Sequence, residues 1–389
     1  MKTYNFDEYI NRKNTSSVKW DETVHIFGRG DVLPMWVADM DFQAPIEVTQ
    51  AIMEKAKHGI YGYTTISTSV DDAVKSWFLG RHGWDLNTEW FTYISGVVPA
   101  LSATIQAFSD PGDKIILFSP VYYPFYDMIK HNDRKVLISP MQYKDGRYHM
   151  DLAHFESQLD GTVKMLLLCN PHNPGGTVWT QEELKQLGEI CVEHGIIVVA
   201  DEIHADLVLK GNSYTPFASI SEEIALQTVT CLAPTKTFNI AGLQASVMVT
   251  PNQIMREKLQ FFMKRQGHFT LNIFGISAME AAYRHGGQWL EEVMEYIEEN
   301  MDIAVSFIQN EIPEVIAFKP EGTYLLWIDC RKLGLEDEEL TRRLLHKGKL
   351  ALDSGKKFGK EADGFVRMNV ACTRATLQEG LERLKKALQ

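Results

Sequence analysis

Short apolar runs alternate with helical stretches through the middle of the chain. Runs without polar alternation that are rich in β-branched residues are typical of parallel strands buried on both faces. We interpret six runs as strands, each beside Gly, Pro, Asp or Asn: Ile115–Phe118, Val136–Ile138, Val163–Leu168, Ile196–Ala200, Val229–Ala233 and Val247–Val249. The pattern predicts an α/β fold in which helices cover both faces of a mostly parallel central sheet.

Two predicted helices carry strong sequence signals. Thr180 is followed at the third position by Glu183, which is the spacing of a capping box, and Gly195 ends that helix. A longer amphipathic helix has its apolar residues at helical spacing: Leu290, Val293, Met294, Ile297, Met301, Ala304 and Ile308. Its glutamates lie on the opposite face, which we interpret as a solvated surface rather than a metal site.

The pattern of predicted elements changes after about residue 280. Beyond the long helix, TYLLWIDC and GFVRMNVA are predicted to be strands, and the charged stretch LEDEELTRRLLHKG between them is predicted to be helical. We therefore predict a large α/β domain over residues 46–280. Residues 1–45 and 281–389 are predicted to form a smaller α+β domain, with no Gly/Ser or Pro linker at either boundary.

Composition narrows the classes of partner. The 389 residues include 39 Lys and Arg against 51 Asp and Glu, which gives a net charge of −12. This acidic balance offers no electrostatic footprint for nucleic acid or anionic lipid. No apolar run reaches the length of a membrane span, and the first residues lack the apolar region of a signal peptide. We expect a soluble, cytoplasmic protein with no nucleic-acid or membrane partner.

The five cysteines indicate neither a disulfide framework nor a zinc site. Their number is odd, they are widely spaced, and no C-x-x-C pair occurs: Cys169, Cys191, Cys231, Cys330 and Cys372. Several lie within apolar runs, where a cysteine acts as a small buried hydrophobe. No cysteine is assigned a catalytic role, and no metal is expected.

Candidate chemistry lies where polar residues directly follow the predicted strands. In open α/β sheets, ligands bind beyond the carboxyl ends of the strands. Asn173 follows one strand in N-P-H-N-P-G-G, Asp201 follows the next in D-E-I-H, and Lys236 follows a third in A-P-T-K-T-F-N. Each alone has an ordinary interpretation: an Asp here is often a helix cap, and a loop Lys is usually a solvated charge.

Together these three residues favour pyridoxal 5′-phosphate as a cofactor. Its aldehyde joins a lysine amine, its ring nitrogen needs a carboxylate, and its ring oxygen needs a hydrogen-bonding neighbour. Lys236, Asp201 and Asn173 are predicted to fill these roles in that order.

The phosphate of this cofactor needs backbone donors at the start of a helix. The segment YISGVVPALS supplies a strand-to-helix turn, in which the amides of Gly96, Val97 and Val98 can face an anion and Pro99 is predicted to be the first helical residue. Taken alone, the segment would be interpreted as an ordinary strand-to-helix turn.

Two further residues follow predicted strands. Tyr122 in SPVYYPF either lays its ring against the cofactor or belongs to the core, and the sequence favours neither. Arg374 in MNVACTR is a candidate for a substrate carboxylate, since a guanidinium matches that anion with two parallel hydrogen bonds; in isolation it would be interpreted as a surface charge.

The motifs N-P-H-N-P-G-G, D-E-I-H and T-K-T-F-N-I-A-G, in this order and spacing, resemble those of fold-type I pyridoxal phosphate enzymes, the class I/II aminotransferase superfamily. The resemblance runs through nearly the whole chain. The segments PMWVADMDF, YGYT, GVVPALS, LLCNPHNPGGTVW and ADEIH are similar to the C–S β-lyase branch, the MalY/PatB group of cystathionine β-lyases and cysteine desulfhydrases.

The resemblance implies a role for each matched residue. Lys236 would hold the cofactor, Asp201 would face the ring nitrogen, Asn173 the ring oxygen, and Tyr122 would stack on the ring. Arg374 would bind the substrate carboxylate.

The remaining residues implied by the resemblance lie around the same site. His204 and Thr235 would add cofactor contacts, and Asp39 would lie at the mouth of the site beside the substrate. Tyr63, or Tyr61 if the register differs, would reach the phosphate and substrate of a second subunit, which makes a homodimer with a shared active site the functional unit.

Two departures from the superfamily pattern bear on the reaction. Ala233 stands where the superfamily often has Ser, and Gln244 stands where aspartate aminotransferases carry an Arg for the phosphate. A typical aspartate aminotransferase is therefore disfavoured, and Thr235 with backbone amides must hold more of the phosphate.

The resemblance implies a C–S β-lyase that releases thiol, pyruvate and ammonia from L-cysteine-type amino acids. The same residues serve an aminotransferase, so the choice between these reactions rests on the resemblance and not on spacing. A regulatory protein on an enzyme fold is a third hypothesis, and the intact Lys236 and Asp201 argue against it.

Overall fold

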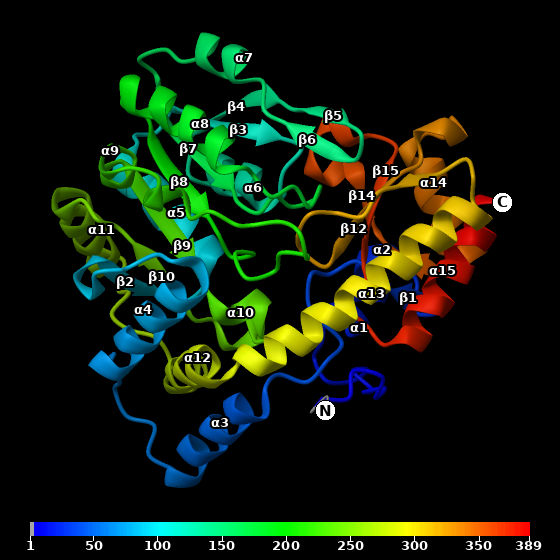
Figure 1. Ribbon diagram of the computed structural model, residues 1–389, viewed down its shortest axis with the longest axis horizontal. Coiled ribbons are helices and arrows are strands. Elements are labelled where there is room, and N and C mark those ends of the chain that lie inside the picture. Colours follow the sequence, from blue (N-terminus) through cyan, green and yellow to red (C-terminus); the bar gives the residue numbers. More distant parts are fainter. Residues whose placement is uncertain (1–3) are drawn as a thin grey trace.

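The computed structural model describes residues 4–389 and is built around a seven-stranded sheet (Figure 1). The strand order is β2-β10-β9-β8-β7-β3-β4. Strands β4, β3, β7, β8 and β9 pair in parallel, whereas β10 pairs antiparallel with both β9 and β2. The strands are β2 (Phe91–Ile94), β3 (Lys114–Ser119), β4 (Lys135–Pro140), β7 (Val163–Cys169), β8 (Ile197–Asp201), β9 (Thr228–Leu232) and β10 (Ser246–Val249).

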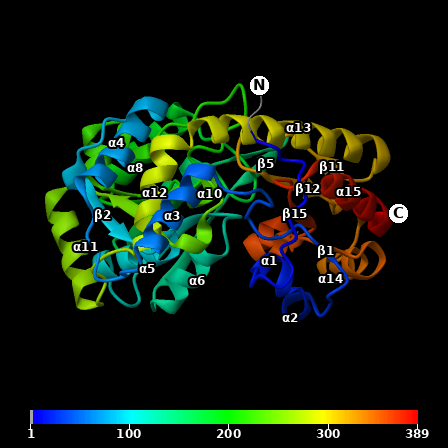
Figure 2. The same cartoon turned by 90° about the horizontal axis from the view of Figure 1, so that it is seen from below.

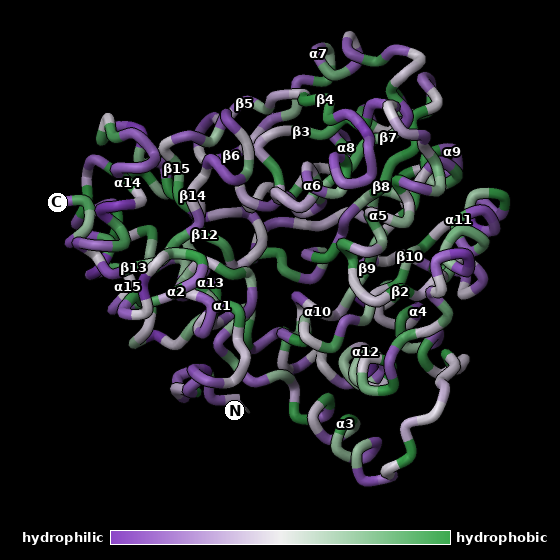
Figure 3. Tube along the Cα trace, turned by 180° about the vertical axis from the view of Figure 1, so that it is seen from behind, coloured by the Kyte–Doolittle hydropathy of each residue, from purple (hydrophilic) through white to green (hydrophobic). Residues whose placement is uncertain are grey.

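Successive residues of the central strands point to opposite faces, and both faces are buried. In β3, Ile115 and Leu117 pack with α5 (Val97–Phe108), α6 (Pro124–His131) and α11 (Gln253–Arg265). Ile116 and Phe118 pack on the other face with α7 (Leu152–Ser157), α8 (Gln181–Glu193) and α9 (Glu222–Leu226). The central strands are therefore mostly apolar, as the green stretches near the centre of Figure 3 show.

The remaining helices of this larger part lie below the sheet in the view of Figure 1. They are α3 (Ile46–His58), α4 (Thr68–His82), α10 (Pro234–Thr237) and α12 (Ile273–His285). A separate hairpin joins β5 (Gln142–Lys144) and β6 (Arg147–His149).

A smaller part combines the two ends of the chain. Its four-stranded antiparallel sheet has the order β11-β12-β15-β14. The elements are β11 (Ile316–Ala317), β12 (Leu325–Asp329), β14 (Asp353–Ser354), β15 (Phe365–Asn369), α14 (Asp337–Arg343) and α15 (Arg374–Leu388). From the N-terminal side come α1 (Val18–Asp21), α2 (Thr23–Phe27) and β1 (Leu33–Pro34), and β1 pairs in parallel with β13 (Leu350–Ala351).

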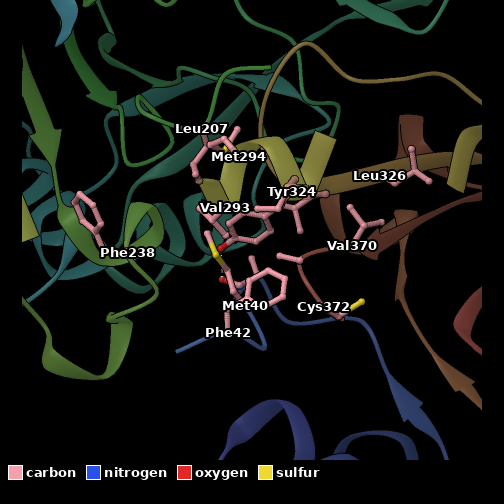
Figure 4. Packing of buried hydrophobic residues seen from close by; sticks show 14 of the residues in the cluster. Met40, Phe42, Leu207, Phe238, Val293, Met294, Tyr324, Leu326, Val370 and Cys372 are labelled. Carbon is pink, nitrogen blue, oxygen red and sulfur yellow. Dashed lines mark hydrogen bonds between the residues drawn. The ribbon is translucent and has the colours of Figure 1, made fainter. Parts of the chain in front are cut away.

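The long helix α13 (Gly287–Glu311) runs from the larger part along the smaller one, as Figure 2 shows. Figure 4 shows the apolar packing beside it: Met40 and Phe42 from the N-terminal segment and Val293 and Met294 of α13 surround Tyr324. Segments far apart in the sequence therefore share one core where the two parts meet.

The fold class and the principal elements predicted from the sequence are confirmed. The six predicted strands occur with ends that differ by at most a few residues, and Thr180 and Glu183 form the predicted capping box of α8. The predicted apolar face of α13 is buried. The domain boundaries at residues 45/46 and 280/281 stay a prediction. Among residues 4–389, no helix is both long and apolar enough to cross a membrane.

Candidate active site

A pocket of about 280 Å³ lies at the carboxyl ends of β2, β3, β7, β8 and β9. These strands run in the same direction, so the loops that follow them converge at one edge of the sheet. The structure brings together nine of the residues singled out from the sequence, all of which line this pocket: Gly96, Val97, Val98, Tyr122, Asn173, Asp201, His204, Thr235 and Lys236. Their individual roles stay predictions.

Lys236 lies in the short helix α10, directly after β9. Its Nζ donates a hydrogen bond of 2.6 Å to the backbone carbonyl of Ala38, which comes from the N-terminal segment. Burial lowers the pKa of the Lys236 amine to about 8, while the nearby Asp39 carboxylate raises it and the Arg367 guanidinium lowers it. The amine is therefore much more readily deprotonated than an exposed lysine.

Asp201 is the last residue of β8 and is only 4% exposed. Its Oδ1 accepts a hydrogen bond of 3.2 Å from the backbone amide of Ile203. Burial raises the pKa of the Asp201 carboxyl to about 7, against the opposing effects of that amide and of Lys236. A cation placed beside this carboxylate would offset the free-energy cost of its desolvation, because an opposite charge favours the ionised form.

His204 supplies an unsatisfied polar atom in the pocket wall. Burial lowers the pKa of its imidazole to about 3, and the positive charges of Lys236 and Arg367 lower it further, so the ring is neutral. Its Nδ1 is buried and has no hydrogen-bond partner among the described residues. Buried polar atoms are normally satisfied, so this atom is consistent with a ligand or water in the pocket.

The turn between β2 and α5 forms another wall. Gly96 has φ +111°, which only glycine adopts readily, and its amide donates to Ser246 Oγ at 3.1 Å. Helix α5 begins at Val97, so the prediction that Pro99 is the first helical residue is wrong by two positions. Pro99 is still tolerated because first-turn amides have no intrahelical acceptor. The amides of Val97 and Val98 belong to this turn and can serve an anion.

Tyr122 lies in the loop after β3, and its ring centroid is 5.4 Å from that of Tyr123. Burial raises the pKa of the Tyr122 phenol, so the side chain stays neutral. The residue both lines the pocket and packs against the core, so the two interpretations left open by the sequence are compatible.

The sequence analysis missed Arg367, which lies within β15. Its side chain is buried, and its Nη1 donates a hydrogen bond of 2.8 Å to Oδ1 of Asn173, a pocket residue. Arg367 also influences the pKa of Lys236 and His204. The available signal was a single charged residue inside the otherwise apolar strand GFVRMNVA, because a buried charge needs a partner.

Arg374 does not line this pocket, and the structure corrects the prediction that it meets a carboxylate there. It is the first residue of α15, where its Nη2 forms an ion pair of 2.6 Å with Glu299. Its Nη1 bonds to Asn300 Oδ1, and its guanidinium lies 4.5 Å from the ring centroid of Tyr296. Its position after a predicted strand suggested a place in the pocket, but its side chain points to α13 and is already paired with Glu299.

Asp39 and Tyr63 lie outside the pocket wall. Asp39 borders an adjoining cavity of about 250 Å³ that shares Ala241 with the pocket, and it pairs with Arg12 at 2.8 Å. Tyr63 is fully exposed within this chain. The predicted substrate contact of Asp39 and the predicted reach of Tyr63 into a second subunit stay predictions.

Seven residues of the pocket wall were not predicted as contacts, among them Ala38, Cys169 and Gln244. Ala38 supplies the carbonyl that holds Lys236, and Cys169 ends β7 with a thiol whose pKa is raised by burial. Gln244, noted in the sequence only as a departure, also lines the pocket. Ala38 and Cys169 carry no polar or charged side-chain signal that sequence inspection uses.

A buried lysine and a buried carboxylate at the carboxyl edge of a doubly covered sheet define a class of cofactor-dependent α/β enzyme. Residues 31–384 match the family described as aminotransferase class I and II. The chain belongs to this family.

Full-length relatives place the chain among C–S lyases within that family. It is 50% identical over 385 residues to cystathionine β-lyase PatB of Bacillus subtilis (strain 168), covering 99% of this chain and 100% of the relative. Cystalysin of Treponema denticola, solved with pyridoxal 5′-phosphate, is 37% identical with a TM-score of 0.96 over 99% of this chain and 98% of its own. The pyridoxal-phosphate-bound C–S lyase of Staphylococcus hominis is 31% identical with a TM-score of 0.93 at the same coverage.

Proposed function

We propose that this protein is a pyridoxal-phosphate-dependent C–S β-lyase of the cystathionine β-lyase type. It cleaves the bond between Cβ and sulfur in L-cysteine-type amino acids, and water completes the release of thiol, pyruvate and ammonia. The observation that carries the proposal is the meeting of Lys236 and Asp201 in one buried pocket of a chain that is 50% identical to PatB along its length.

The residues of the pocket fit pyridoxal 5′-phosphate. Lys236 offers an amine of lowered pKa, Asp201 a carboxyl group whose pKa is raised by burial, and His204 a ring nitrogen with no hydrogen-bond partner among the described residues. The amides of Val97 and Val98 at the start of α5, with Thr235, supply donors for a phosphate. The Lys236 amine matches the aldehyde of that cofactor, the Asp201 carboxyl group matches its ring nitrogen, and the amides with Thr235 match its phosphate.

When bound, pyridoxal phosphate supplies an aldehyde that joins amines and a ring that withdraws electrons from the substrate Cα. Asp201 would hold the ring nitrogen in its protonated form, because an ionised carboxylate favours a neighbouring cation. Lys236 removes the proton from the substrate Cα as a general base, for which a pKa of about 8 is well matched to neutral pH. The electron pair left at Cα would form a double bond to Cβ as the Cβ–S bond breaks, and the sulfur would leave with the bonding pair as a thiolate.

Arg367 is the residue we assign to the substrate carboxylate in place of Arg374. It is buried beside Asn173, and its Nε has no hydrogen-bond partner among the described residues. A guanidinium N–H forms a strong, charge-assisted hydrogen bond to a carboxylate, so a spare buried donor next to the pocket suits this role. Binding the carboxylate there would fix the orientation of Cα relative to Lys236.

A homodimer with a shared active site is the proposed functional unit. The support is the surface around Tyr63, where several large apolar side chains are exposed in the single chain: Met53, Ile60, Tyr61 and Phe269. Exposed apolar patches of this kind mark interaction sites. Tyr63 from one subunit would then complete the pocket of the other.

A cytoplasmic location is supported by the cysteines. All five are unpaired and buried, as expected for a protein that folds where thiols stay reduced.

The experiment is incubation of the purified protein with L-cystathionine and pyridoxal phosphate but no keto-acid acceptor. Pyruvate and ammonia in equal amounts are expected, together with thiol. Turnover only after addition of an acceptor would instead establish an aminotransferase. Lys236→Ala is the matched control, since it removes the amine while α10 remains in place.

A further inference from the structure

Arg367 is held on three sides by protein acceptors and keeps donors to spare. Its Nη1 donates to Asn173 Oδ1, while its Nη2 donates to the carbonyl of Trp36 at 3.0 Å and to Asp353 Oδ2 at 2.6 Å. The ring of Phe358 lies 4.7 Å from its Cζ. A guanidinium has five N–H donors, and the buried Nε lacks a partner among the described residues.

Asp353 is the cross-strand neighbour of Arg367, since β14 and β15 pair at these two residues. Its side chain is only 2% exposed, and its second oxygen, Oδ1, accepts a hydrogen bond of 2.8 Å from Lys357 Nζ. One buried carboxylate therefore serves two cations. The three charges add to a net charge of +1 rather than zero.

We propose that Asp353 and Lys357 are positioning residues for Arg367, and that Lys357 keeps this anion-binding site positively charged. The inference rests on the proposed function in so far as Arg367 binds the carboxylate of an amino acid. It deepens that function by assigning selectivity for carboxylates to a charged triad rather than to one guanidinium.

The physical reason lies in the charge of the Arg367–Asp353 pair. Alone, the pair would be neutral, and an incoming carboxylate would meet both the attraction of Arg367 and the repulsion of Asp353. Lys357 offsets the repulsion while leaving Asp353 free to fix the plane of the guanidinium. The same carboxylate thus orients Arg367 without cancelling its charge.

The position of Lys357 is itself fixed by the fold. Its ammonium lies 5.5 Å from the ring centroid of Trp36 and 5.7 Å from that of Tyr123, within the range of cation–π contacts. The turn Gly355–Phe358 carries both Lys357 and Phe358, so one short segment supplies the counter-charge and the ring that packs on Arg367. Trp36 belongs to the N-terminal segment and also accepts a hydrogen bond from Arg367.

Lys357 is 39% exposed, so its contribution is subject to screening by salt. An effect of about three- to tenfold on carboxylate affinity is therefore expected, rather than the far larger effect of a fully buried charge. Neutral analogues of the same amino acid should not respond to Lys357.

The test uses the cofactor-loaded protein and two probes without a leaving group at Cβ, L-alanine and L-alaninamide. Their dissociation constants are measured from the change in the visible spectrum of the bound cofactor. In Lys357→Gln, the affinity for L-alanine should fall about three- to tenfold, while that for L-alaninamide stays within twofold. Lys357→Arg should restore the wild-type ratio, because it keeps the charge.

Lys185→Gln is the matched control, since Lys185 forms an exposed i,i+4 pair with Glu189 on α8, outside the pocket. It should change neither constant. For C–S cleavage, Lys357→Gln should raise KM with little change in kcat.

Equal losses for both probes in Lys357→Gln, or no loss for either, would overturn the proposal. The spectral readout does not depend on which reaction follows binding. The wild-type protein could therefore prefer L-alanine over L-alaninamide, and lose that preference in Lys357→Gln, without releasing pyruvate from L-cystathionine. That result would contradict the lyase assignment while supporting this inference.

Discussion

At the scale of single residues, burial pushes three titratable groups of the pocket toward their neutral forms. It raises the pKa of Asp201 to about 7 and lowers those of Lys236 and His204 to about 8 and about 3. Removing a charge from water is costly, so burial shifts the pKa of each group toward its uncharged form, and a nearby opposite charge opposes that shift. A cationic ring nitrogen beside Asp201 would provide that charge.

The lowered pKa of Lys236 predicts how the cofactor-free protein reacts with pyridoxal phosphate. Only the neutral amine attacks an aldehyde, so the rate of covalent uptake should rise with pH and level off above about 8. With an ordinary lysine, the rate would keep rising with pH up to the usual lysine pKa of about 10.4. The measurement is the appearance of the visible band as a function of pH, with Lys236→Ala as the variant that should show none. A midpoint near 10 would contradict the assignment.

Two arginines can be compared directly, because the sequence favoured Arg374 and the structure favours Arg367. Arg367→Lys keeps the charge but loses the paired donors, so KM for L-cystathionine should rise about tenfold or more. Arg374→Ala breaks an ion pair with Glu299 at the edge of α15 and should leave KM unchanged. Steady-state kinetics of both variants decide between them. A raised KM in Arg374→Ala with a normal value in Arg367→Lys would restore the prediction made from the sequence.

At the scale of elements, the site depends on how strands end. Asn173, Asp201 and Lys236 end or follow adjacent parallel strands, so sheet pairing alone brings their loops together. The turn between β2 and α5 adds a helix start to the same edge. The positive end of the helix dipole then lies at the pocket, where it would stabilise the phosphate of the proposed cofactor.

Gly96→Ala tests this helix start. The residue has φ +111°, so a side chain there should cost about 1–3 kcal/mol of the free energy of unfolding and displace the first-turn amides. Weaker cofactor binding is expected as well, by about tenfold. Gly80→Ala is the control, because Gly80 lies in α4 with ordinary backbone angles and open space around it. It should stabilise the protein by about 0.5–1 kcal/mol. Thermal unfolding and cofactor titration measure both effects.

At the scale of the whole molecule, the pocket lies where distant parts of the chain meet. Lys236 and Asp201 come from the larger sheet, the Ala38 carbonyl from the N-terminal segment, and Arg367 from the C-terminal sheet. Neither part alone contributes all of these groups. Relative movement of the two parts would change the distance between Arg367 and Lys236, and with it the placement of a substrate.

A dimer with shared active sites predicts that two inactive variants restore activity when they are mixed, which sites within single chains would not do. Tyr63→Ala and Lys236→Ala should each abolish or strongly reduce activity as homodimers. When the two variants are mixed and allowed to exchange subunits, half of the dimers are mixed, and each holds one site with both wild-type residues. Activity should then recover to about one quarter of wild type, given random pairing in a two-fold dimer. No recovery, despite subunit exchange shown by mass, would contradict a site that includes Tyr63 of the partner subunit.

The sequence by itself determined the fold class, the central strands, the helix after Thr180 and most of the pocket. It could do so because these features depend on local patterns: apolar runs, capping residues and polar residues directly after strands. Lys236, Asp201 and Asn173 stand in such positions. The pocket residues that the sequence predicted therefore lie at the edge of the sheet. There, residues that follow successive parallel strands in the sequence are also neighbours in space.

Only the tertiary structure separated the positions of Arg367 and Arg374 relative to the pocket. One lies within a strand and faces the pocket loops, and the other lies one element later and faces α13. It also placed Ala38 on Lys236 across nearly two hundred residues, and Asp353 and Lys357 behind Arg367. These contacts join segments whose separation along the chain carries no periodic signal. Their geometry is set by how the two parts of the molecule pack together.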